Sequence, residues 1–156
     1  MGHYTIAIIK PNFHMVEVSQ YIKQVFEENG FTCHFNYDLK AERLSKEQAI
    51  DLYSGLRGKE YQDKPVQFIL NGFCVVMVWY HPGDAVAIAK QLVGPTYALQ
   101  AMQEDCIRGF LLEYFGTAQE PYFNAANFIH VPGDDVERDQ QMEAIFGVAK
   151  AKQWQN

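Results

Sequence analysis

The sequence predicts an α+β fold in which helices cover a four-stranded antiparallel β-sheet. Two runs of apolar and β-branched residues, at 4–9 and 73–80, have the character of strands buried on both faces. Segments with apolar residues at helical spacing separate these runs from two further strand candidates. Glycine, proline and capping residues mark the ends of the segments, so the elements can be assigned in order.

The first half of the chain has clear starts and stops. Pro11 ends the first strand because proline has no N–H for the sheet ladder. Gly30 ends the first helix, and the capping box Ser45-Lys46-Glu47-Gln48 begins the second. The elements predicted here are strands at residues 4–9 and 31–39, and helices at 15–29, 45–53 and 66–70.

The second half contains the strongest strand signal, since no polar residue interrupts residues 73–80. Asp84 caps the helix that follows, and Gly116 ends a later one. The stretch from 97 to 104 has less pattern, and we assign it no element. The elements predicted here are strands at 73–80 and 127–130, and helices at 84–93, at 107–115 and around 142–146.

This order of elements fits the ferredoxin-like βαββαβ arrangement. A length of 156 residues suits a single domain, residues 1–156, with a core of its own. Many unrelated functions occur on this fold, so function must come from the site residues.

Composition narrows the class of function. The net charge of −6 argues against a nucleic-acid-binding face driven by bulk charge, although a small basic pocket can lie within an acidic protein. Cys33, Cys74 and Cys106 lack metal-binding spacing, which favours free thiols in a reducing compartment. The sequence shows no signal-peptide pattern and no run of membrane-spanning length. We therefore expect a cytoplasmic protein.

His130 is the first candidate for chemistry. It ends the apolar stretch Asn127-Phe128-Ile129-His130 and leads into a turn-rich segment, a position that suits a nucleophile or a general base. Lys10, at the end of the first strand, could face the same cleft. A structural histidine and a solvated lysine are the alternatives for the two residues taken singly.

Four motifs in order connect these residues to a family: Lys10-Pro11, Gly94-Pro95-Thr96, Ile107-Arg108-Gly109 and Asn127-Phe128-Ile129-His130. With them, roughly residues 4 to 146 resemble the nucleoside diphosphate kinases. That family moves the terminal phosphoryl group of a nucleoside triphosphate to a nucleoside diphosphate through a phosphohistidine, with ping-pong kinetics. The resemblance implies a phosphotransferase whose nucleophile is His130.

The resemblance also implies roles for other residues. Lys10 and Tyr53 match catalytic positions beside the histidine and the transferred phosphate. Tyr61 matches a phenylalanine that stacks on the base, and Asn127 an asparagine that contacts the sugar. The implied nucleotide-binding residues are Lys10, Tyr61, Lys90, Thr96, Arg108 and Asn127.

Further expectations concern cofactors and partners. Magnesium is expected on the nucleotide phosphates rather than in a metal site made of protein side chains. Nucleoside di- and triphosphates are the expected partners, with no membrane and no sequence-specific nucleic acid. The resemblance also implies a homo-oligomer.

The departures from the family cluster around the nucleophile. Pro132 stands where the family has a serine, and Gln141 falls where a glutamate orients the histidine. Lys90 replaces an arginine, and the segment from Leu111 to Ala126 is longer than usual. These changes leave two alternatives: a divergent member that binds nucleotide or a protein partner with little transferase activity, and a ferredoxin-like module in which His130 is structural.

Overall fold

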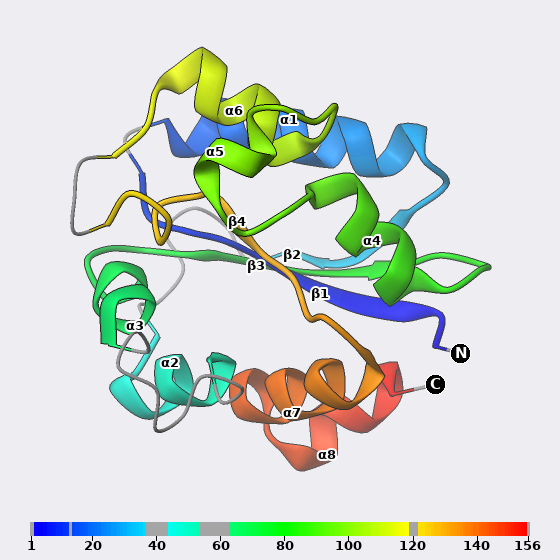
Figure 1. Cartoon of the computed structure of the whole chain (residues 1–156). Coiled ribbons are helices and arrows are strands. Elements are labelled where there is room, and N and C mark those ends of the chain that lie inside the picture. Colours follow the sequence, from blue (N-terminus) through cyan, green and yellow to red (C-terminus); the bar gives the residue numbers. More distant parts are fainter. Residues whose placement is uncertain (1, 13, 37–43, 54–62, 119–121, 156) are drawn as a thin grey trace.

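The computed structural model describes residues 2–12, 14–36, 44–53, 63–118 and 122–155. Within these residues four strands form one sheet in the order β2-β3-β1-β4, and all three neighbouring pairs are antiparallel (Figure 1). The predicted fold class is confirmed, and the two runs expected to be most buried are the two inner strands. The strands are β1 (Tyr4–Ile9), β2 (Thr32–Asn36), β3 (Val75–Tyr80) and β4 (Ile129–His130).

Helices cover both faces of the sheet, in two layers (Figure 1). The layer that contains α1, drawn above the sheet, and the layer that contains α7, drawn below it, are named here after those helices. The α1 layer consists of α1 (Met15–Glu28), α4 (Ala85–Val93), α5 (Ala98–Ala101) and α6 (Ile107–Phe115). The α7 layer consists of α2 (Lys46–Leu52), α3 (Asp63–Ile69), α7 (Asp135–Phe146), α8 (Val148–Ala151) and the 3₁₀ turn η2 (Lys152–Trp154).

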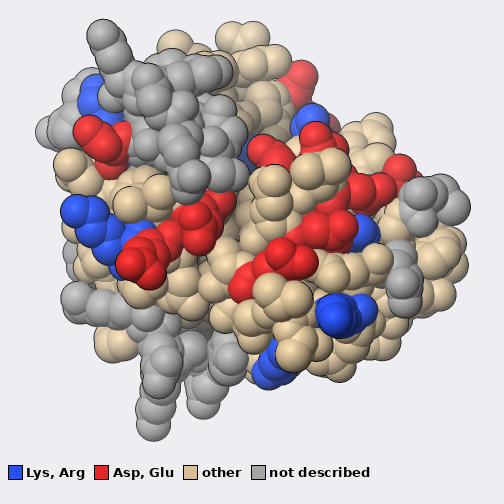
Figure 2. Space-filling model, turned by 90° about the horizontal axis from the view of Figure 1, so that it is seen from below, with Lys and Arg blue, Asp and Glu red and all other residues tan. Residues whose placement is uncertain are grey.

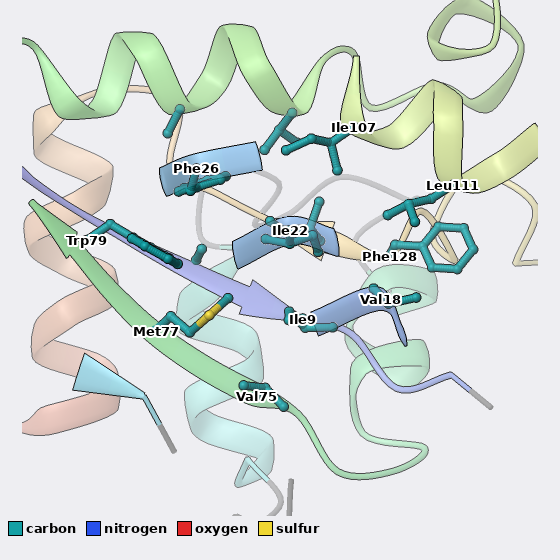
Figure 3. Close-up of a cluster of buried hydrophobic side chains, with 14 of the residues drawn as sticks. Ile9, Val18, Ile22, Phe26, Val75, Met77, Trp79, Ile107, Leu111 and Phe128 are labelled. Atoms are coloured by element: carbon teal, nitrogen blue, oxygen red, sulfur yellow. The ribbon is translucent and has the colours of Figure 1, made fainter. Parts of the chain in front are cut away.

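The apolar runs of β1 and β3 divide between two cores because successive strand residues point to opposite faces. Ile9, Met77 and Trp79 pack under the α1 layer, where Figure 3 shows side chains of α1 and α6 above them. Ile6 and Ile8 pack against the α7 layer together with alternate residues of β3. Both faces of the inner strands are therefore buried, as the absence of a polar face predicts.

The capping residues in the sequence correctly predicted where two helices begin. The capping box of α2 is present, and Asp84 caps α4 through its side chain. Gly94 follows α4 with a φ of +89°, and a Cβ at this position would collide with Cys106 Sγ. Glycine is needed there for both its backbone conformation and its size.

The structure differs from the prediction mainly in the lengths of two strands and in three short helical elements. The residues 37–39 of the predicted second strand lie outside the described residues, and β4 has only its last two predicted residues. The four-residue helices α5 and α8, and η2, were not predicted, since so few residues show no periodicity. Tertiary packing holds the last two in place: Trp154, 5% exposed, lies against Phe35 and Phe146.

The acidic charge gathers on the α7 layer, where Figure 2 shows clusters of Asp and Glu. Glu47 and Asp51 of α2 are exposed there, and Asp134, Glu137 and Glu143 lie at the start of α7 and along it. No described helix is both long enough and apolar enough to cross a membrane.

Candidate active site

Strand pairing brings Lys10 and His130 to the same face of the sheet. In the β1–β4 register Ile8 lies opposite His130, and Lys10 follows Ile8 by two residues, so all three point toward the α7 layer. The Lys10 backbone N–H donates to Phe128 O at 2.7 Å, which continues this pairing beyond the strand. Two residues 120 positions apart in the chain thus share one site.

Tyr53, the residue that follows α2, contacts both His130 and Lys10 from the α7 layer. Its ring meets the His130 ring edge-on, with the ring centroids 5.0 Å apart. The Lys10 ammonium lies 5.8 Å from the centre of the same Tyr53 ring. Burial raises the pKa of the Tyr53 hydroxyl, so this group stays protonated at neutral pH.

The backbone before His130 is strained. Phe128 has a φ of +74°, the only positive φ among the described non-glycine residues, and Ile129 N donates to Asn127 O across it at 2.9 Å. Together these features define a γ-turn of the rare positive-φ kind. Strain of this sort persists only where surrounding contacts hold it, and it concentrates at functional sites. Here the Phe128 side chain, 7% exposed, anchors the turn in the core beneath the α1 layer (Figure 3).

Asn127 links the lysine to the Gly94–Thr96 loop. Its side-chain oxygen accepts from Lys10 Nζ at 2.6 Å, and its side-chain nitrogen donates to the Thr96 carbonyl at 2.9 Å. Lys10 Nζ also donates to Ala125 O at 3.0 Å. Asn127 is fully buried, so in this structure it positions the ammonium and does not present its amide to solvent.

We expect Asn127→Ala to lower the free energy of unfolding by about 2–4 kcal/mol, because a buried polar network loses two hydrogen bonds and Lys10 loses an acceptor. Chemical denaturation of the variant and the wild type measures this. Thr96→Ala is the matched control, since Asn127 bonds the Thr96 backbone and not its side chain. Equal losses in both variants would contradict the linking role.

Arg108 is the second cation of the site, and it comes from the first turn of α6. It is 6% exposed, and its guanidinium donates to Gly94 O and to Ile129 O, each at 2.7 Å. The guanidinium therefore ties the end of α4 to β4, directly beside His130. Burial lowers the pKa of Arg108 to about 10, which still leaves the group charged at neutral pH.

The two cations have no counter-ion among the described residues. All the protein acceptors of Lys10 and Arg108 are neutral, whereas the ion pairs that the described residues form belong to Arg138. Burial, and after it the charge of Arg108, lowers the pKa of Lys10 well below its usual value. An anion bound between the two would offset both effects. The site is thus a pair of buried cations without a described carboxylate partner, whereas the surface of the α7 layer is acidic (Figure 2).

The same environment keeps His130 neutral. Burial of the ring, and after it the charges of Lys10 and Arg108, lower the pKa of His130 to about 3. A hydrogen-bonding contribution from the Gln141 side chain acts the other way and is the smallest cause. At neutral pH the imidazole therefore carries a free lone pair, which nucleophilic attack requires.

Gln141, on α7, lies near enough to His130 to affect the pKa of the ring. The side chain is 2% exposed and donates from Nε2 to Leu52 O at 3.3 Å. That bond leaves the amide oxygen as the group available to the ring. His130 Nε2 is buried and has no hydrogen-bond partner among the described residues.

The His130 shift predicts an acid-sensitive stability. An unfolded imidazole has a pKa of about 6.5. Between that value and about 3 the unfolded chain takes up a proton that the folded protein excludes, so the free energy of unfolding falls as pH falls. This one group should lower the free energy of unfolding by about 2.5 kcal/mol between pH 6 and pH 4.

Denaturation at both pH values measures the effect. We expect His130→Gln to lose much less stability over this interval than the wild type. His34→Gln, in the exposed edge strand β2, is the matched control and should keep the wild-type slope. An unchanged slope in His130→Gln would contradict the excluded proton.

The remaining predicted residues lie at the edge of the site or outside the described chain. Lys90 is exposed on α4, and its ammonium lies near Gly133, in the turn that follows His130. Thr96 is exposed and contributes its carbonyl to Asn127. Tyr61 falls outside the described residues. Pro132 is buried next to the histidine and offers no hydroxyl.

Sequence reasoning missed the backbone carbonyls of Ala125 and Leu52, which hold Lys10 and Gln141. No side-chain signal could have found them, because any residue can supply a carbonyl. It also missed Glu137, whose carboxylate accepts from Gly133 N at 2.5 Å and shapes the turn after His130.

No three His, Cys, Asp or Glu side chains of the described residues converge on a point where a metal ion could bind. The polar groups that reach the site are cationic or amide groups, which suit phosphate oxygens rather than a metal. A metal at this site would therefore have to come bound to a phosphate ligand.

A sequence model described as nucleoside diphosphate kinase matches residues 3–150 of the chain. The chain belongs to the nucleoside diphosphate kinase family. Its sequence is 30% identical over 105 residues to a nucleoside diphosphate kinase of Fervidobacterium nodosum, a match that covers 67% of this chain and 68% of that protein. It is 36% identical over 102 residues to one from Thermosynechococcus vestitus, covering 62% of each.

Solved structures of the family agree in fold. A nucleoside diphosphate kinase of Aquifex aeolicus superposes with a TM-score of 0.75 at 23% identity, covering 94% of this chain and 96% of that one. One from Encephalitozoon cuniculi gives a TM-score of 0.74 at 22% identity, covering 93% and 89%. The predicted resemblance is therefore confirmed at the level of family and fold.

Proposed function

We propose that this member of the nucleoside diphosphate kinase family transfers the γ-phosphoryl group of a nucleoside triphosphate to a nucleoside diphosphate, with His130 as the phosphoryl carrier. The observation that carries the proposal is the site itself. A neutral imidazole lies beside two buried cations that lack any described carboxylate partner. This is the arrangement that in-line attack on a phosphate requires, since the protein's task there is positioning and positive charge.

The first step joins His130 Nδ1 to the γ-phosphorus. The lone pair of the neutral ring forms the N–P bond while the bond from phosphorus to the β,γ-bridging oxygen breaks, and the nucleoside diphosphate leaves with that electron pair. The Gln141 side-chain oxygen would accept a hydrogen bond from Nε2–H, which would fix the ring tautomer in which Nδ1 is unprotonated. In the second step an oxygen of the acceptor's terminal phosphate attacks the same phosphorus and restores the ring.

The cations act on the phosphate oxygens. Lys10 and Arg108 would exchange carbonyl partners for phosphate oxygens, which gives their charges the counter-ion that the free protein lacks. Lys90 and Thr96, both exposed, would bind the outer phosphates, and Tyr53 would donate to the transferred group. Asn127 would hold Lys10 in place, and Tyr61 would stack on the base.

Magnesium, when bound with the nucleotide, supplies further positive charge to the phosphates. The residues described here would reach the phosphate oxygens that remain free of the metal. We further propose nucleoside di- and triphosphates as the partners and no sequence-specific nucleic acid. A homo-oligomer in the cytoplasm, comprising a single domain per chain, completes the proposal.

A specific observation supports a second candidate, a nucleotide-binding member with little transferase activity. Gln141 is neutral and cannot stabilise an imidazolium or a phosphorylated ring by charge, and Pro132 brings no hydroxyl. The binding cations are complete in either case, so nucleotide affinity would remain.

Labelling separates the two candidates. The purified full chain is incubated with ATP labelled in the γ-phosphate and with magnesium, then treated with acid or alkali. The kinase should carry label that acid removes and alkali spares, and should return it to an added nucleoside diphosphate. An unlabelled protein whose melting temperature nevertheless rises with ADP would establish the second candidate instead.

A further inference from the structure

A groove lies between α1 and α6, in the α1 layer, whereas His130 points toward the α7 layer. The two helices run side by side in this layer (Figure 1). The groove has a volume of about 320 Å³, within the lower range of ligand sites. His14, Glu17 and Tyr21 line it from one face of α1, since residues three and four apart in a helix share a face. Phe110, Tyr114 and Phe115 line it from α6.

Five rings form a continuous series along this groove. Tyr21 stacks on Phe110 with ring centroids 4.5 Å apart and planes 22° apart, and Phe110 lies nearly parallel to Tyr114 at 5.8 Å and 14°. At the other end Tyr114 meets Phe115 edge-on at 4.9 Å, and Phe115 stacks on His14 at 4.5 Å. Because neighbouring rings in this series are in contact, a ligand can reach only the ring faces and edges that remain exposed.

These rings are exposed to an unusual degree. Phe110 is 47% exposed and Tyr114 is 72% exposed, although both belong to a helix whose other face is fully buried in the core. The rings also lie where the chain from Leu111 onward departs in length from the family pattern. Folding alone does not explain an exposed aromatic series of this size, whereas a binding role does.

The charged residues of the groove indicate which kind of ligand it can bind. Glu17 is exposed and forms no ion pair among the described residues, and no Lys or Arg belongs to the lining. Burial, and after it the nearby charges of Asp105 and Glu28, raise the pKa of Tyr21, so two further carboxylates lie near the groove. Two grooves facing each other would bring carboxylates together without Lys or Arg to balance them, so a second copy fits poorly.

We propose that this aromatic groove binds an arginine side chain on a segment of a partner protein. A planar guanidinium stacks on aromatic faces and pairs with a carboxylate through two parallel hydrogen bonds. The flat rings of Phe110 and Tyr114 and the free carboxylate of Glu17 supply both requirements. The site is independent of phosphoryl transfer, because it lies across the sheet from His130.

The test is a titration of the full chain with a short acetylated and amidated peptide that carries one central arginine. The shifts of the protein's aromatic ring protons in NMR spectra follow binding. The comparison ligand is the same peptide with citrulline, which has the same shape without the charge. We expect the citrulline peptide to bind at least about tenfold more weakly. Free arginine should also bind more weakly than the peptide, because it lacks the contacts of the flanking chain.

Variants assign the binding to the groove. Glu17→Gln and Tyr114→Ala, both at exposed positions, should weaken the arginine peptide about fivefold or more. Glu113→Gln makes the same charge change on α6 outside the groove and should leave binding unchanged. Equal binding of the citrulline peptide, no binding of the arginine peptide, or free arginine binding as tightly as the peptide would each overturn the proposal. Self-association of the protein that Tyr114→Ala abolishes would overturn it in favour of a second copy.

Discussion

Replacing His130 with alanine is expected to abolish the acid-labile phosphoprotein and to lower nucleotide exchange by about 10⁴-fold or more, since loss of a covalent nucleophile leaves only binding and electrostatic effects. The fold should survive, because His130 is the last residue of the two-residue strand β4 and its Nε2 forms no hydrogen bond within the described chain. Labelling with γ-labelled ATP and steady-state exchange between ATP and a second diphosphate measure the two effects.

His34→Ala is the matched control for this variant. His34 is exposed in the edge strand β2 and packs edge-on against Tyr4, far from the candidate site in sequence and on the outer edge of the sheet. It should keep full labelling. A His130→Ala protein that still accepts acid-labile phosphate would show that another residue carries the group.

The second large effect concerns Lys10. We expect Lys10→Met to reduce kcat/KM about 10²–10³-fold, since each preorganised charge on a transferring phosphate contributes several kcal/mol in a site shielded from water. Lys10 is 3% exposed, so methionine fits a comparable volume without the ammonium. The rise in melting temperature with ADP should shrink as well, because the buried cation no longer gains an anion.

Lys90→Met serves as the comparison. Lys90 is exposed on α4, where solvent screens its charge, and its loss should reduce kcat/KM by less than about tenfold. Equal losses of activity in the two variants would show that burial does not strengthen the effect of the Lys10 charge.

Gln141 is a neutral residue on α7 near the candidate nucleophile. Its amide is fixed by the Leu52 carbonyl at the end of α2, so the side chain can accept from the ring but cannot match a charge on it. The imidazole is therefore oriented by geometry, while its neutrality follows from burial and from two neighbouring cations. A carboxylate at this position could both orient the imidazole and balance a positive charge on it, whereas the Gln141 amide can only orient it.

The sequence by itself determined the strands and long helices, because burial on both faces, helical spacing and capping residues are local patterns. The uninterrupted apolar run of β3 and the capping box of α2 are examples. It also identified the family, since the motifs around Lys10, Arg108 and His130 keep their order along the chain. The short helices α5 and α8 escaped prediction because their positions depend on tertiary contacts.

The contacts of those motif residues, by contrast, depend on the tertiary structure. The antiparallel pairing of β1 with β4 places Lys10 and His130 on one face, and the carbonyls of Ala125, Gly94 and Ile129 hold the two cations without neutralising them. The lowered pKa of His130 follows from that enclosure. Sequence patterns report which side chains are present, whereas burial and unpaired charge exist only after distant segments have packed together.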